Sequence, residues 1–414
     1  MKRMVIALLT FSVTVLSSLP AAAILPSTGG VREGLPNVPD SALVATIDSL
    51  LTDSIWQTAQ VGIYIHDVTA DVPLYAFNAN QRMRPASTEK LVTAISALDN
   101  LGPNHALTTR LYTDGEVTDS VLHGNVWLAG GMDPMTTADD IRALIASLPT
   151  LGIDSIDGGI RYDVSMKDTL RYGWGWCWDD DNHVLTPFLC DRKPLTTALV
   201  ASALRRAGVT VREPVQTSSA TVGLGAVTQR PPLPFRAQTV HTLADVLQRM
   251  MKESDNLYAE SVFYQIAARS GRPWAGRKQA VNLIQNTMKR AGVSSDAYNV
   301  ADGSGLSLYN YQTPVTLARL LIYAARNKVI YETLRESLPI AGVDGTLNNR
   351  MKNTSAQGNV RAKTGTVTGV TSLAGYATNA DGHLIAFAII VNGLQKGAPG
   401  RTLQDNICVA IVEN

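Results

Sequence analysis

Ser87 and Lys90, a serine and a lysine three residues apart, are the first residues in the chain that could do chemistry together. Pro85 and the apolar run from Leu91 predict a buried helix that begins near the serine, with both side chains on one face. A serine there lies among backbone N–H groups that have no helical partner. A lysine kept neutral by burial among cationic neighbours could accept its proton, which is the arrangement of an activated nucleophile.

Two further motifs occur downstream. Ser254-Asp255-Asn256 separates two apolar helical segments, and a Ser-x-Asn triplet at such a joint could direct both polar groups into one cleft. Lys363-Thr364-Gly365 lies inside a predicted strand, where a glycine often marks the close approach of another backbone or a ligand. The three motifs occur once each and in this order, and together they are the set found in class A β-lactamases and penicillin-binding proteins.

The elements that would position these motifs come from both ends of the chain. Strands are predicted over residues 60–67, 73–78, 358–367, 371–377 and 383–392. A closing helix is predicted over residues 403–412. They predict an α/β fold of the α+β kind, with one antiparallel five-stranded sheet flanked by helices.

Residues 106–235 have a different pattern, with short strands, short helices and a loop containing Trp174, Trp176 and Trp178. We interpret this region as an inserted mixed α/β domain. The flanking segments, residues 24–105 and 236–414, would then form one discontinuous domain. The three tryptophans could stack on a glycan, but we favour their packing the insertion against the main body.

The first residues and the composition indicate the compartment. Lys2 and Arg3, the apolar run after them and small residues up to Ala23 predict a signal peptide over residues 1–23. No other apolar stretch is long enough to span a membrane. The net charge of +1 gives no reason to expect nucleic acid or an anionic membrane surface as a partner. We expect a soluble protein of the periplasm or cell envelope without a stable membrane anchor.

Three cysteines fit an exported protein. Cys177 and Cys190 flank a short polar loop and are predicted to form a disulfide, the alternative being two free thiols. Cysteine and histidine positions show no metal-ligand spacing, so neither a metal nor another cofactor is predicted.

With its three motifs, the chain resembles the penicillin-recognising serine D-Ala-D-Ala carboxypeptidases, specifically the DacB-like carboxypeptidase/endopeptidase branch. The resemblance covers nearly all of the mature chain and includes residues 124–134, 173–176, 302–307 and 341–346. The first two of these ranges lie in the insertion, which class A β-lactamases lack. The family implies a β-lactamase/transpeptidase-like sheet and a DD-peptidase domain interrupted by the insertion.

The chain also departs from this family. The stretch between Ser87 and Ser254 is shorter than in members with two nested insertions, and we interpret residues 216–238 as a connector in place of the second. Residues 185–190 lack the pattern of the family at the edge of the substrate cleft. The breadth of substrates therefore stays open, whereas acyl transfer does not depend on this region.

The resemblance implies a role for each motif residue. Ser87 would attack the carbonyl between the last two D-alanines, Lys90 would be the base, and Ser254 would relay the proton to the leaving amine. Backbone N–H groups of Ser87 and Thr366 would form the oxyanion hole. The substrate would be bound by the amide of Asn256, the charge of Lys363, the hydroxyls of Thr364 and Thr366, and the strand at Gly365.

The implied partners are peptidoglycan stem peptides and β-lactams as covalent inhibitors. A β-lactamase on the same scaffold and a non-catalytic penicillin- or cell-wall-binding protein are the alternatives, and the intact motifs argue against the second. We assign no chemistry to Glu89 or Asp255. We interpret Asp302, Ser304 and Asp344 as parts of structural turns, the alternative being that their Gly-rich loops border the cleft.

Overall fold

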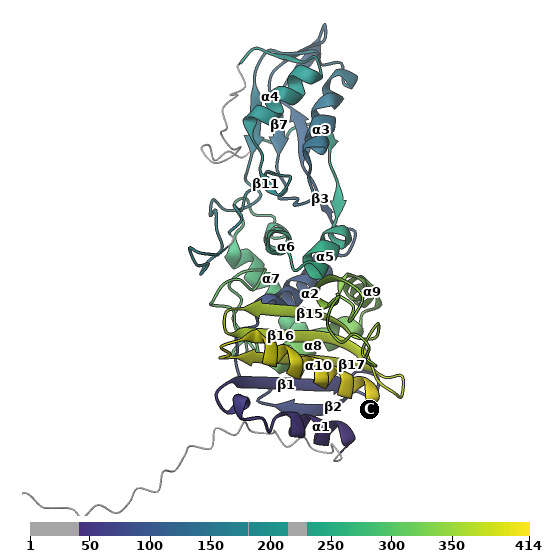
Figure 1. Cartoon of the computed structure of the whole chain (residues 1–414). Coiled ribbons are helices and arrows are strands. Elements are labelled where there is room, and N and C mark those ends of the chain that lie inside the picture. The colour runs from purple at the N-terminus through teal and green to yellow at the C-terminus, as the bar shows by residue number, and fades with distance from the viewer. Residues whose placement is uncertain (1–40, 181, 214–229) are drawn as a thin grey trace, which may run out of the picture.

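The computed structural model describes residues 41–180, 182–213 and 230–414. Figure 1 shows an elongated molecule with a large sheet and most of the helices at one end and the smaller sheets with α3 and α4 at the other. The predicted signal peptide and most of the predicted connector lie outside the described residues. Within the described ranges, no helix has the length and apolar character needed to cross a membrane.

The large sheet is antiparallel and has the strand order β15-β16-β17-β1-β2. β1 pairs with β17, so the first strands of the chain are joined to the last one (Figure 1). The predicted five-stranded antiparallel sheet built from both ends of the chain is thus confirmed. Its strands are β1 (Gln60–Asp67), β2 (Val72–Phe77), β15 (Arg361–Val367), β16 (Val370–Thr378) and β17 (Leu384–Asn392).

Side chains of the central strand β17 alternate between two hydrophobic cores. Phe387 and Ile389 belong to the core that contains α1 and α10, whereas Ala388 and Ile390 belong to the core around α2. Successive side chains of a strand point to opposite faces, and here helices cover both. Figure 1 shows α10 on one side of the sheet and α8 on the other. The helices of the first core are α1 (Ala42–Leu50) and α10 (Gly397–Glu413).

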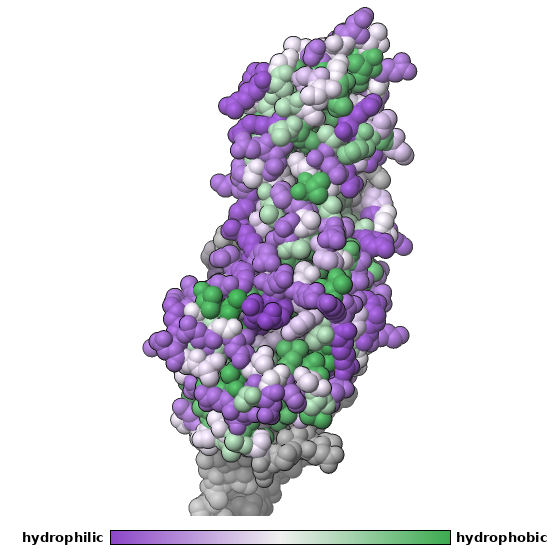
Figure 2. Space-filling model, turned by 90° about the vertical axis from the view of Figure 1, so that its right-hand side faces the viewer, coloured by the Kyte–Doolittle hydropathy of each residue, from purple (hydrophilic) through white to green (hydrophobic). Residues whose placement is uncertain are grey.

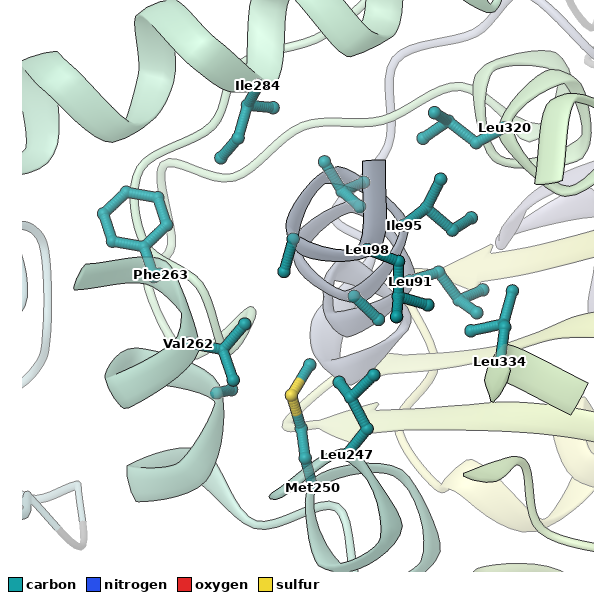
Figure 3. Close-up of a cluster of buried hydrophobic side chains, with 14 of the residues drawn as sticks. Leu91, Ile95, Leu98, Leu247, Met250, Val262, Phe263, Ile284, Leu320 and Leu334 are labelled. Carbon is teal, nitrogen blue, oxygen red and sulfur yellow. The ribbon is translucent and has the colours of Figure 1, made fainter. Parts of the chain in front are cut away.

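Helix α2 (Glu89–Leu101) is the centre of the second core, and its first ten residues are buried. Figure 3 shows Leu91, Ile95 and Leu98 of this helix surrounded by side chains of the neighbouring helices. Apolar residues lie on nearly every side of this helix, which favours its enclosure, and the polar residues of its first turn, including Lys90, are enclosed with it. The surrounding helices are α5 (Leu243–Lys252), α6 (Asn256–Ala268), α7 (Arg277–Arg290), α8 (Pro314–Ala325) and α9 (Lys328–Ser337).

The other end of the molecule holds two four-stranded mixed sheets, ordered β12-β8-β6-β5 and β13-β4-β7-β9. They share a core with two helices, α3 (Ala138–Thr150) and α4 (Thr197–Arg206). The strands of this end and of the junction are β3 (Ala106–Leu107), β4 (Arg110–Thr113), β5 (Glu116–Thr118), β6 (Val121–His123), β7 (Val126–Ala129), β8 (Ser155–Ile156), β9 (Ile160–Asp163), β10 (Leu189–Cys190), β11 (Lys193–Pro194), β12 (Thr210–Val211), β13 (Phe235–Gln238) and β14 (His241–Thr242).

The chain crosses between the two ends of the molecule twice, and the crossings lie side by side because β3 pairs with β14. β13 pairs with β4 and so belongs to a sheet of the insertion. It spans the predicted boundary between residues 235 and 236, which places the return of the chain slightly later, after Gln238. Apart from this detail, the division into domains stays a prediction.

The surface seen in Figure 2 is largely hydrophilic, and its hydrophobic residues lie in small separate groups. Most apolar side chains of the described residues are instead collected in three interior clusters, one on each face of the large sheet and one in the insertion.

Cys177 and Cys190 are free thiols, so the predicted disulfide is wrong. Cys190 is buried in the core of the insertion, where burial raises the pKa of its thiol to about 12 and disfavours the thiolate. Cys177 lies in a loop tied to the other end of the molecule, because Trp176 Nε1 donates a hydrogen bond to Asp302 Oδ2 at 2.8 Å. The two cysteines, although close in sequence, are anchored in different surroundings.

Candidate active site

Ser87 lies in a short 3-10 turn, Ala86–Thr88, that leads directly into α2. Ala86 has a φ of 49°, and non-glycine residues in this conformation cluster at functional sites. The Thr88 hydroxyl donates to Pro85 O at 2.7 Å and secures the turn. A turn, and not the helix itself, therefore presents the Ser87 hydroxyl.

Lys90 is fully buried in the first turn of α2, and its Nζ donates three hydrogen bonds. The acceptors are Ser87 Oγ at 3.0 Å, Asn256 Oδ1 at 2.7 Å and Ser304 O at 2.8 Å. Burial lowers the pKa of Lys90 to about 8, while nearby carboxylates act in the opposite direction. The burial that we expected is thus the main cause of the shift, whereas the cationic neighbours expected with it are not among its main causes.

Four buried acidic residues act on Lys90 electrostatically: Asp302, Glu260, Asp255 and Glu89. Burial raises the pKa of Glu260 to about 8 and that of Glu89 well above its ordinary value. Glu260 also accepts a hydrogen bond from Gly303 N at 3.1 Å. The amine of Lys90 therefore lies near two carboxyl groups that favour their protonated form. Because a protonated carboxyl has no charge, these groups stabilise the ammonium form of Lys90 less than ionised carboxylates would.

The Ser-x-Asn motif lies at the joint between α5 and α6, as predicted. Ser254 has a φ of 59°, a second strained non-glycine residue in the site. Asn256 begins α6, and its Oδ1 contacts Lys90. The joint therefore brings both polar side chains of the motif to the cleft.

Asp255, between these two residues, is almost completely buried and holds the joint in place. It caps α6 by accepting from Leu257 N at 3.1 Å. It also accepts from Arg249 Nε at 2.9 Å and forms an ion pair with Arg192, which comes from the insertion. The interpretation that Asp255 orients the neighbouring backbone agrees with these contacts.

Lys363 is fully buried on β15, facing the same cleft. Its Nζ donates to Ser254 Oγ at 2.9 Å and to Thr364 O at 2.7 Å. Burial lowers the pKa of Lys363 well below its ordinary value, and the charge of Lys90 lowers it further. Each serine hydroxyl of the site is therefore in contact with one buried lysine: Ser87 with Lys90, and Ser254 with Lys363.

Gly365 allows β15 to lie directly against the turn that carries Ser87. A Cβ atom at this position would lie 2.7 Å from Pro85 O, which is too short for a real contact, and 3.0 Å from Ser87 N, which is tighter than most real contacts. The close approach that the glycine predicted is thus present. It brings the backbone around Thr366 next to that of Ser87, the pair of residues expected to supply the oxyanion hole.

A pocket of about 300 Å³ opens beside the two serines. Thr346 lies at its wall, where its Oγ1 accepts a hydrogen bond of 2.7 Å from Thr364 Oγ1. Thr346 belongs to a Gly-rich loop visible in the sequence. Two arginines, Arg350 and Arg401, also line the pocket, and no sequence signal indicated them. The lining residues are Ser87, Ser254, Thr346, Arg350, Thr364, Thr366 and Arg401.

The two Gly-rich loops act mainly as structural turns, as interpreted. Asp302 accepts hydrogen bonds from Gly305 N at 2.8 Å and Ser307 N at 2.7 Å, and Asp344 pairs with Lys252 at 2.6 Å. The first loop nevertheless reaches the site through a backbone group, because the carbonyl of Ser304 accepts from Lys90.

The aromatic loop packs the insertion against this first Gly-rich loop. Trp176 is bonded to Asp302, and the ring of Trp174 lies 4.7 Å from that of Tyr309. Trp178, by contrast, is 94 % exposed. The packing interpretation therefore agrees with the contacts of two of the three tryptophans.

Comparison with known proteins gives a family that covers the chain from the first helix onward. The D-Ala-D-Ala carboxypeptidase 3 (S13) family matches residues 43–190 and 185–413. A D-alanyl-D-alanine carboxypeptidase from Actinomadura sp. is 28% identical over 98% of this chain and 90% of its own length.

Solved structures show a similar fold. The crystal structure of penicillin binding protein 4 (dacB) from Haemophilus influenzae has a TM-score of 0.76 at 24% identity, covering 87% of this chain and 98% of that one. The same protein complexed with a β-lactam has a TM-score of 0.71 at 24% identity, covering 89% of this chain and all of that one. The predicted penicillin-binding-protein type of fold is confirmed.

Proposed function

The chain belongs to the D-Ala-D-Ala carboxypeptidase 3 (S13) family and is a serine-type peptidase, and from this premise we propose that it releases the terminal D-alanine of peptidoglycan stem peptides through an acyl-enzyme on Ser87. One observation carries the proposal: Lys90 Nζ, on α2, contacts both Ser87 Oγ and the Asn256 amide from α6. The nitrogen of the proposed base is thus in contact with both the proposed nucleophile and the group that can bind the substrate amide.

In the first step, neutral Lys90 accepts the proton of Ser87 Oγ across their 3.0 Å contact while the oxygen attacks the carbonyl carbon of the penultimate D-alanine. With a pKa of about 8, roughly one tenth of the lysine is neutral at pH 7. The backbone N–H groups of Ser87 and Thr366 stabilise the oxyanion, an effect of roughly 3–4 kcal/mol per donor.

Collapse of the tetrahedral intermediate breaks the C–N bond and needs a proton on the leaving amine. We assign its delivery to Ser254, a role supported by a hydroxyl that lies 2.9 Å from Lys363 Nζ and borders the pocket beside Ser87. Thr364 and Thr366 present hydroxyls on the same wall to the carboxylate of the departing D-alanine. Water then hydrolyses the ester on Ser87.

Peptide cross-links and β-lactams are the further ligands that we propose for this site. A β-lactam would acylate Ser87 by the same attack and remain bound, because its ring-opened leaving group stays attached to the acyl-enzyme. A signal peptide over residues 1–23 would export the enzyme to the compartment that holds peptidoglycan.

The test is to incubate the mature protein with a pentapeptide monomer and with a cross-linked dimer. Release of D-alanine from the monomer is expected, together with dimer cleavage if cross-links are substrates. Ser87→Ala should abolish both this release and covalent labelling by a fluorescent penicillin, because no other nucleophile is proposed. Activity that survives in Ser87→Ala would refute the assignment, and rapid turnover of the penicillin by the wild type would favour a β-lactamase.

A further inference from the structure

The pocket beside Ser87 has two arginines at its wall and no carboxylate among its lining residues. Arg350 is already engaged: its Nε and Nη2 donate to Asp405 Oδ1 at 2.9 and 2.6 Å, and Nη2 also lies 3.1 Å from Gln404 Oε1. The charge of Arg350 is thus balanced by Asp405, and its Nε and Nη2 donors are already used in hydrogen bonds within the protein.

Arg401, on α10, is exposed and forms no ion pair with any residue in the described part of the chain. Its guanidinium lies over the start of the helix, since a Cβ atom on Gly397 would be 2.7 Å from Arg401 Nη1 and 3.1 Å from Thr371 Cγ2. Thr371 is the cross-strand partner of Thr366. The free guanidinium is therefore beside the end of β15 at which Thr366 borders the pocket.

Lys363, the cation expected to attract the substrate, is less suited to bind a carboxylate. Its side chain has no exposed surface, and its Nζ is bonded to Ser254 Oγ and Thr364 O. The remaining uncompensated positive charge at the pocket is that of Arg401. A guanidinium matches a carboxylate with two parallel hydrogen bonds, which a lysine ammonium does not.

We propose that Arg401 binds the free carboxylate of the residue that leaves, opposite the hydroxyls of Thr364 and Thr366, and so makes the enzyme select peptides with a free C-terminal carboxylate. This inference rests on the proposed function of the site. Arg401 would be a specificity-determining residue, since it touches the substrate away from the reacting bond.

The experiment compares a peptide ending in D-Ala-D-Ala with the same peptide as its C-terminal carboxamide. The wild type should have a higher kcat/KM for the free acid. Arg401→Gln should lower kcat/KM for the acid by about 10- to 100-fold, the loss of a charge-assisted contact, and leave the amide within about twofold. Arg206→Gln, which removes another exposed arginine at the end of α4 in the insertion, should keep the wild-type ratio.

The outcomes separate this inference from the proposed function. A wild type that hydrolyses neither peptide contradicts the proposed function. A wild type that hydrolyses acid and amide equally, or an Arg401→Gln variant that loses both activities in parallel, overturns the role of Arg401. If Arg401→Gln folds poorly, Arg401→Lys is the second variant: its preference for the acid should be weaker than that of the wild type, and an unchanged preference would overturn the inference.

Discussion

Two lysines withdrawn from water contact the two serine hydroxyls of the site, and their burial is what changes their acidity. Lys90 has its pKa lowered to about 8 by burial, against the opposing effect of the acids around it. The pKa of Lys90 therefore depends also on acidic groups that take no part in the proposed reaction. Glu260 is one of these, because its carboxyl is buried and its own pKa is raised to about 8.

The pH profile tests this balance. Because Lys90 must be neutral to accept a proton, kcat/KM for D-alanine release should rise with pH and reach half of its maximum near pH 8. Glu260→Gln should move this midpoint to lower pH, since an ionised Glu260 favours the charged form of Lys90. The glutamine can still accept from Gly303 N.

Steady-state kinetics between pH 6 and 10 give both midpoints. Glu213→Gln, which changes an exposed glutamate paired with Arg161 in the insertion, is the control and should leave the profile unaltered. A profile that does not change with pH, or a midpoint that rises in Glu260→Gln, would contradict the assigned role of Lys90.

At the scale of elements, the proposed mechanism requires β15 to lie close against the turn that carries Ser87. Gly365 is the residue that permits this contact, as a Cβ atom there would also meet Ser372 Oγ at 2.2 Å. The strand carries Lys363, Thr364 and Thr366, so any outward shift moves all three groups away from Ser87 at once.

Gly365→Ala should therefore reduce acylation by a penicillin by roughly 100-fold or more, because a displacement of about 1 Å is enough for such a loss. The second-order rate of acylation measures this directly. Gly358→Ala, at a glycine with φ of 75° and open space around its Cβ position, introduces only backbone strain and should acylate at nearly the wild-type rate. Similar rates in Gly365→Ala and the wild type would show that the contact is not needed.

Sequence patterns predicted the parts of this site that depend on local structure. Ser87, Lys90, Ser254, Asn256 and Lys363 lie in one cleft, and the strand glycine makes the close contact that its position indicated. The strands of the large sheet were predicted because their apolar runs and turns are local signals. The assigned chemical roles stay predictions.

The missed features depend on tertiary packing. Arg401 lies on α10, which packs on β16, and Arg350 pairs with Asp405 of the same helix. Neither arginine has a neighbour pattern in the sequence that would indicate these contacts. α10 begins at Gly397, earlier than the predicted 403, because proline and glycine are compatible with a first helical turn. The disulfide failed because sequence proximity says nothing about the core in which each cysteine is held.

At the scale of the whole molecule, the insertion is more than an appended domain. The turn between β10 and β11 carries Arg192, which pairs with Asp255 and lies over the ring of Tyr258 together with Arg249. Asp255 lies between Ser254 and Asn256 in the sequence, so its contacts help to fix the positions of both. The insertion thus supports the joint that positions two groups of the site.

Arg192→Ala should weaken acylation by about tenfold, because a nearly buried carboxylate loses one of its two guanidinium partners. The acylation rate and the melting temperature should be measured together. Arg212→Ala, which removes an arginine paired with Asp157 inside the insertion, is the matched control and should acylate normally. Equal rates in Arg192→Ala and the wild type would mean that the insertion does not support the joint.

The pairing of β1 with β17 sets the order in which a newly made chain can become active. Until residues 384–392 have left the ribosome, β1 has only β2 as a partner, and an isolated two-stranded hairpin is marginally stable at best. Ser87, the proposed nucleophile, is made early in synthesis, whereas Lys363 and the strand that lies against Ser87 are made late. On the proposed mechanism, a partly synthesised chain therefore carries Ser87 without the surroundings that would activate it, and hydrolytic activity would develop only when synthesis is nearly finished.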